Sequence, residues 1–244
     1  KAIYKRELRS YFTSPIGYVF VAVYLVLSGV LFAYTTLLSA ISGGSADIGT
    51  YFTVLICGFS FLLPLLTMRL FADDRRMKTE QLLLTAPVSI GGMVGAKFLA
   101  AYTVFAGTYA VSALDFLLLY IYNDTTGVVT EKNTAMLVGY SIAVLLLGAA
   151  FIAIGVFVSS LTEHQITAVI ATIAILAFCL CCGMLNSVIS FAPLRSVLSW
   201  LSIYSRFQNF AYGVFDFNAI IYYLSITFVF LFVTVRVYEK RRWA

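Results

Sequence analysis

The fold class is decided by one stretch of sequence, residues 135–158, which reads AMLVGYSIAVLLLGAAFIAIGVFV. It contains no charged residue, and it is longer than the roughly 20 residues that an α-helix needs to cross the hydrocarbon core of a membrane. Apolar and polar residues do not alternate along it, which argues against a strand of a transmembrane β-barrel. Residues 135–158 therefore predict a transmembrane helix.

Five further stretches have the same character. They cover residues 16–38, 51–68, 98–122, 166–189 and 218–235. The composition agrees, because 61% of the 244 residues are hydrophobic and 11% are charged, against about 45–50% and about 25% in soluble domains. This composition excludes a soluble enzyme, a disordered chain and a disulfide scaffold. We expect an all-α, polytopic membrane protein whose six helices form a single transmembrane domain.

The basic residues indicate the orientation of these spans. Of the 16 Lys and Arg residues, thirteen lie before the first span, between spans two and three, or after span six. The positive-inside rule places such segments in the cytoplasm, so both termini are expected there. The net charge of +5 is then a sign of topology rather than of nucleic-acid binding.

A basic amphipathic helix is predicted at residues 1–15, before span one. Its apolar face carries Tyr4, Leu8, Tyr11 and Phe12, and its basic face carries Lys5, Arg6, Arg9 and Ser10. Such a helix lies in the membrane interface, and Pro15 separates it from the first span. The alternative is a plain basic anchor that only flanks the span.

A second amphipathic segment, residues 190–213, connects spans five and six. Apolar residues recur along it at helical spacing, and Arg206 lies on the opposite, polar face. Trp200 is expected to anchor it at the membrane interface. The segment is too polar to span the membrane and too apolar to be fully solvated.

The densest charge cluster lies between spans two and three. Its residues are Asp73, Asp74, Arg75, Arg76, Lys78 and Glu80, and the apolar Leu82 and Leu83 follow. Pairs at i,i+4, such as Asp74 with Lys78, favour a helix over residues 73–86, which Pro87 should end. Leucines beside dense charge are typical of a docking surface. A solvated helix without a partner is the alternative.

Motifs for catalysis and metal binding are not found in the sequence. It has no G-x-x-x-x-G-K-[ST] loop, H-E-x-x-H or G-x-S-x-G, and its single histidine, His164, has no second ligand at metal spacing. Asp115 is the one ionisable residue inside a predicted span, so it is a candidate functional residue or a solvated group near the outer boundary. It is the sole support for an ion-coupled carrier or channel that works without ATP.

Four strings of sequence resemble motifs of one family. They are KRELRSYFTSP at 5–15, RMKTEQLLLTAPVS at 76–89, SLTEHQ at 160–165 and SRFQNFAYG at 205–213. Together with the pattern of spans, they are similar to the permeases of ABC-2 type transporters, which have the type V exporter fold. The branch that the chain resembles most is the gliding-motility-type permeases of bacteria.

The resemblance implies a mechanism. Two permease subunits would pair in the bacterial inner membrane and dock two ATPase subunits, which bind ATP and Mg²⁺, so this chain would hold no cofactor and would not be an enzyme. Residues 73–86 would be the coupling helix, and Glu163 and His164 would make a second contact with the ATPase.

The resemblance also assigns the two amphipathic segments. Residues 1–15 would be the connecting helix, and 190–213 would be a re-entrant outer hairpin. The assembly would export or extract a substrate, or transmit force across the membrane. Relatives in this branch often work with an extracytoplasmic accessory subunit. A membrane scaffold of an envelope machine, without transport, is a further alternative.

Overall fold

The computed structural model describes residues 2–38, 48–78, 89–121, 131–185, 202–208, 210 and 216–243, and the elements within these ranges are helices. Six stretches are long and apolar enough to cross a membrane: Pro15–Thr36, Ile48–Arg76, Ile90–Leu117, Thr134–Leu161, Gln165–Cys182 and Phe217–Arg242. The prediction of an all-α chain with six spans is therefore confirmed. The chain is a multi-pass membrane protein.

Within the described residues the chain forms a series of helices. They are α1 (Ala2–Thr13), α2 (Pro15–Leu31) with a π-helical end, η1 (Phe32–Leu37), α4 (Ile48–Thr67), α5 (Arg69–Arg76), α7 (Ile90–Ser112), α8 (Asp115–Ile121), α10 (Glu131–Leu161), α11 (Gln165–Leu185), α13 (Ile203–Gln208) and α14 (Phe217–Trp243). A discrete helix before the first span is thus observed, and Pro15 occupies the first turn of α2, where a proline costs no hydrogen bond.

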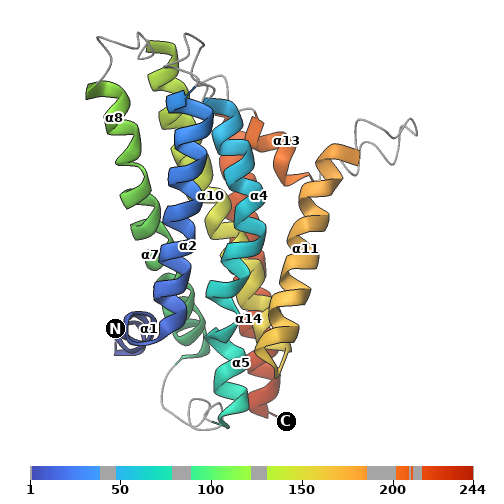
Figure 1. The fold of residues 1–244 in the computed structure, drawn as a ribbon. Coiled ribbons are helices and arrows are strands. Elements are labelled where there is room, and N and C mark those ends of the chain that lie inside the picture. The colour runs from blue at the N-terminus through green and yellow to red at the C-terminus, as the bar shows by residue number, and fades with distance from the viewer. Residues whose placement is uncertain are drawn as a thin grey trace.

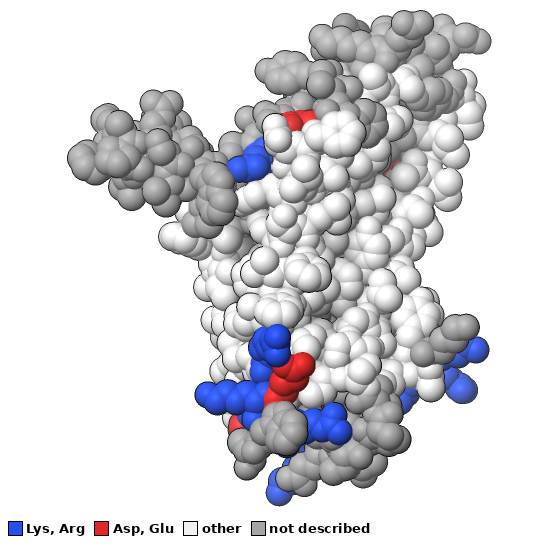
Figure 2. Space-filling model, turned by 180° about the vertical axis from the view of Figure 1, so that it is seen from behind, with Lys and Arg blue, Asp and Glu red and all other residues white. Residues whose placement is uncertain are grey.

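The spans run side by side, and α1 crosses the bundle at one end (Figure 1). Both termini lie at that end, as an even number of spans requires. Charged side chains gather there, and a wide band of other residues covers the middle of the molecule (Figure 2). We call this end, built by α1, α5, the start of α7, residues 161–165 and the end of α14, the charged end.

Two helices form the centre of the bundle. About two thirds of the α4 and α10 spans is enclosed, at 61% and 67%, against 22% for α11 and 17% for α14. The close packing uses small residues of α10: a methyl group on Gly148 would overlap the ring of Phe105, and one on Gly155 would overlap Thr67. Such contacts hold helices together in lipid, where the hydrophobic effect does not.

The helix predicted at residues 73–86 differs in the structure. After α4 the chain turns at Met68 and forms α5, which starts earlier than predicted and ends at Arg76. Lys78 has a φ of 56°, in the left-handed region, so a continuous helix through residue 78 is wrong. Residues 79–88, with Glu80, Leu82 and Leu83, lie outside the described residues.

Candidate functional site at the charged end

The short helix α5, with sequence RLFADDRR, occupies the centre of the charged end. Its residues Leu70, Phe71 and Ala72 are buried in the bundle. The ring of Phe71 lies 4.9 Å from the ring of Tyr238 on α14. With its apolar side fixed in this way, α5 presents its charged side chains to the neighbouring helices.

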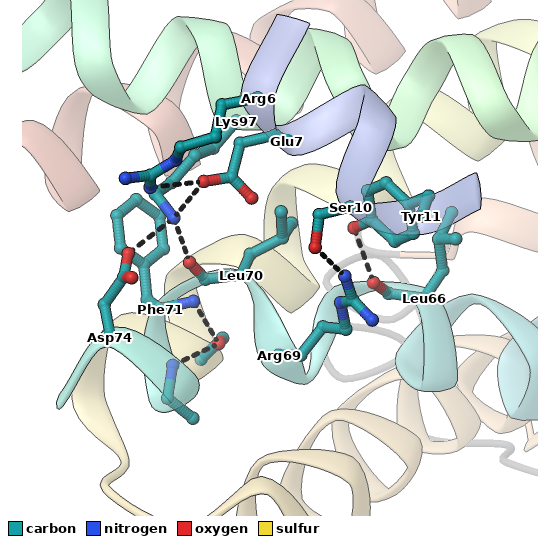
Figure 3. A network of polar contacts seen from close by, with 12 residues as sticks. Arg6, Glu7, Ser10, Tyr11, Leu66, Arg69, Leu70, Phe71, Asp74 and Lys97 are labelled. Atoms are coloured by element: carbon teal, nitrogen blue, oxygen red, sulfur yellow. Dashed lines mark hydrogen bonds and ion pairs between the residues drawn. The ribbon is translucent and has the colours of Figure 1, made fainter. Parts of the chain in front are cut away.

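Lys97 of α7 is the most buried charge at this end, with 2% of its side chain exposed. Its ammonium nitrogen lies 2.6 Å from the Asp74 carboxylate of α5 and 3.2 Å from the Glu7 carboxylate of α1. It also donates a hydrogen bond to the backbone carbonyl of Leu70 (Figure 3). One ammonium group therefore joins three helices, and its burial is offset by two opposite charges.

Glu7 also pairs with a second cation, which lies on its own helix. The Arg6 guanidinium donates a hydrogen bond of 2.8 Å to Glu7, and this bond raises the pKa of Arg6, against a smaller opposing effect of burial. Arg6 is largely exposed, whereas Glu7 has 12% of its side chain exposed. The acid of α1 thus faces the bundle, while the basic residues Lys5, Arg6 and Arg9 face outward.

A second link between α1 and α5 is made by Arg69. Its guanidinium donates hydrogen bonds to the hydroxyls of Ser10 and Ser14 and lies 4.9 Å from the ring centre of Tyr11. The Tyr11 hydroxyl donates a 2.8 Å hydrogen bond to the backbone carbonyl of Leu66 (Figure 3). Burial raises the pKa of Tyr11, and the nearby charge of Arg69 opposes this rise. Because of these contacts, α1 is fixed to the end of α4 as well as to α5.

Ser159 of α10 stabilises the start of α5. Its hydroxyl oxygen accepts hydrogen bonds of 3.2 Å from the backbone N–H groups of Phe71 and Ala72, and it donates one of 2.9 Å to the carbonyl of Met68. The first N–H groups of a helix have no partner within the helix, and Met68 at the N-cap supplies none. A serine from a different helix therefore acts as the cap.

The connection between α10 and α11 is bonded to the other side of α5. Arg75 donates hydrogen bonds of 3.2 Å to the carbonyl of Leu161 and to the carboxylate of Glu163. Gln165 donates one to the carboxylate of Asp73. The charged side chains of α5 thus contact α1, α7 and the start of α11.

The tip beyond α5 faces outward. Arg76, Met77 and Lys78 are exposed, as are Glu163 and His164 on the neighbouring connection. We call these five residues the exposed tip. They provide an accessible surface next to a helix that is firmly bonded to the rest of the bundle.

The predicted site residues thus separate into several groups. Asp73, Asp74 and Arg75 make contacts within the bundle, and the predicted partner of Asp74, Lys78, is replaced by Lys97. The predicted residues that stay accessible to a partner protein are those of the exposed tip, namely Arg76, Lys78, Glu163 and His164. Trp200 and most of residues 190–213 lie outside the described residues.

The two remaining candidates lie away from the charged end. Asp115 is in the first turn of α8, directly after the break at Ala113 and Leu114 that interrupts the third span. An acid in the first turn of a helix interacts favourably with the helix dipole. Arg206 of α13 lies 3.9 Å from the ring centre of Tyr222 on α14.

Sequence reasoning missed three residues that build the site: Lys97, Arg69 and Ser159. For Lys97 a signal existed, because it is the single charge within the otherwise apolar α7. Arg69 and Ser159 carried no signal, since each depends on partners more than 50 residues away in the sequence. Among the described residues, no group of three His, Cys, Asp or Glu side chains could hold a metal ion.

Comparison with protein-family models and with curated proteins gives no match to this chain.

Proposed function

We propose that this chain is the permease subunit of an ATP-binding-cassette transporter in the bacterial inner membrane. It would pair with a second permease and bind two ATPase subunits at the charged end, which faces the cytoplasm. The assembly exports or extracts a substrate, or transmits force across the membrane. Residues 190–213 would form a re-entrant hairpin on the outer side.

The bonding of α5 to three parts of the bundle carries this proposal. A push on α5 reaches α7 and α1 through Lys97, and α1 again through Arg69. It reaches the start of α11 through Asp73 and Gln165. Separating a buried ion pair by removing one partner costs about 3–5 kcal/mol. For this reason α5 and its neighbours move together. This is the property that a coupling element requires.

The exposed tip supplies the surface for an ATPase. Met77, with 71% of its surface exposed, lies between the basic residues Arg76 and Lys78. An exposed methionine between two cations fits a partner groove that has an apolar floor and an acidic rim. The basic residues at this end also favour the cytoplasmic side by the positive-inside rule.

The experiment co-purifies this chain in lipid nanodiscs with ATP-binding-cassette ATPases from its source organism. We expect Arg76→Glu with Lys78→Glu to lower co-purification and permease-stimulated ATP hydrolysis about tenfold, because interfacial charges set specificity and affinity. The matched control is Lys5→Glu with Arg9→Glu, which makes the same charge change on α1. Unchanged hydrolysis in the first variant would contradict the role of the tip, and transport by the chain alone without ATP would contradict the function.

A further inference from the structure

A groove runs along α14 and is lined by residues of α14 and by Arg206 of α13. Helix α13 lies at the end of the bundle opposite the charged end (Figure 1). Its volume is about 780 Å³, within the range of small-molecule sites. Polar residues line the mouth, namely Arg206, Asp216 and Asn218. The rest of the lining is mostly apolar, with Ile226, Val229 and Phe230 among its residues, and it includes the polar Ser225. The groove is therefore amphipathic along its length.

The cation at the mouth is held in place. Arg206 stacks on the Tyr222 ring, with 3.9 Å between its guanidinium carbon and the ring centre. Its helix is anchored by the buried Ile203 and Phe207, and the Tyr223 hydroxyl donates a 2.9 Å hydrogen bond to the carbonyl of Ile203. A stacked guanidinium keeps its N–H edge for hydrogen bonding, in the planar geometry that matches a phosphate.

The groove starts at one end of the membrane span formed by α14 and extends into that span. The lining begins at Asp216, directly before α14, and continues to Phe230 inside the span Phe217–Arg242. At 1.5 Å per residue this covers about 21 Å, more than half of the hydrocarbon thickness of roughly 30 Å. The mouth lies where a lipid headgroup would be, and the apolar part lies where its acyl chain would be.

We propose that this groove binds one phospholipid, with the phosphate on Arg206 and an acyl chain along α14. The guanidinium of Arg206 matches the phosphate in charge, and the carboxylate of Asp216 lines the same mouth. The apolar lining from Ile226 to Phe230 distinguishes a lipid from free phosphate, which would use only the mouth. The inference does not depend on the proposed transporter function, because the groove lies at the other end of the bundle from the exposed tip.

The test is lipid titration of the purified chain, followed by native mass spectrometry. We expect phosphatidylglycerol to bind one-to-one, and diacylglycerol with the same chains to bind about tenfold more weakly, since a charge-assisted hydrogen bond is lost. Arg206→Gln should weaken the binding of phosphatidylglycerol by a similar factor. The control is Arg236→Gln, because Arg236 also stacks on a ring of α14, that of Phe232, but at the charged end.

A second variant keeps the test decisive if Arg206→Gln does not fold. Ser225→Trp fills the middle of the groove and leaves Arg206 in place, so it should weaken lipid binding as well. Equal affinity for diacylglycerol and phosphatidylglycerol would overturn the proposal. So would binding of inorganic phosphate as tight as that of the lipid, or a dimer that Ser225→Trp disrupts while the lipid affinity stays unchanged.

Discussion

The ammonium group of Lys97 lies 2.6 Å from the carboxylate of Asp74, and the lysine side chain is only 2% exposed. Helices α7 and α5 are thus joined by a buried ion pair. Glu7 brings α1 to the same ammonium group at 3.2 Å. A buried pair is costly to break because the remaining charge has neither water nor a partner.

Replacing Lys97 by methionine should therefore destabilise the protein strongly. We expect the free energy of unfolding to fall by about 3–5 kcal/mol, since the Asp74 and Glu7 carboxylates lose their shared cation. The measurement is thermal unfolding of the purified protein in detergent. Lys240→Met is the matched control, because Lys240 is exposed at the same end of the bundle.

Adding Asp74→Asn to the Lys97→Met variant should restore part of the lost free energy of unfolding, because the buried carboxylate without a cation is then removed. A double-mutant cycle of these two substitutions measures the interaction directly. Additive effects of the two single substitutions would show that Lys97 and Asp74 do not stabilise one another.

Substitution of Ser159 by alanine should loosen α5. The backbone N–H groups of Phe71 and Ala72 lose their acceptor in a fully buried site, at a cost of about 1–3 kcal/mol. Hydrogen exchange of residues 69–76 should become faster, which a general loss of packing would not confine to this helix. Ser160→Ala is the control, because among the described residues the Ser160 hydroxyl bonds the carbonyl of Phe157 in its own helix and no group of α5. Equal exchange in the two variants would argue against the cap.

Substitution of Gly155 by alanine should separate α10 from α4. The added methyl group would overlap the buried Thr67 side chain, and overpacking of this kind costs about 1–3 kcal/mol. Gly107→Ala is the control, because an added methyl group there would meet no described atom within 4 Å beyond its chain neighbours and its own helix backbone. Thermal unfolding should distinguish the two, and an unchanged midpoint for Gly155→Ala would show that the two helices are not in close contact.

The orientation of the chain can be tested with single cysteines in a background without the four native ones. Lys78 and Asn218 are exposed at opposite ends of the bundle. A thiol reagent that does not cross membranes should label Asn218→Cys in intact cells, and Lys78→Cys only after the membrane is opened. The reverse pattern would place the charged end outside, against the positive-inside rule.

The sequence was sufficient to predict the spans because burial in lipid imposes a simple requirement, a long apolar helix. It also predicted the separate helix before Pro15, since proline and the change from basic to apolar residues mark a boundary locally. One detail of α1 differs: Ser10, assigned to the basic face, accepts a hydrogen bond from Arg69 of α5.

The site was harder to predict for a physical reason. The pairing of Asp74 with Lys78 on an exposed helix is favourable by only a few tenths of a kcal/mol. The buried Lys97 is the stronger partner of Asp74, because a buried charge that loses its partner is costly. Local spacing therefore gave the wrong partner. Contacts such as that of Ser159 with Phe71 join residues 88 positions apart, and nothing in either local sequence encodes them.

The contrast between the enclosed α10 and the outlying α14 has a consequence for biogenesis. Helix α10 is 67% enclosed, and α14, which packs along it, is the last helix described in the chain and only 17% enclosed. The side of α10 that packs against α14 is synthesised well before α14 itself. A nascent chain must therefore reach α14 before this side of α10 is covered, and a ribosome that stalls before Phe217 leaves that side open.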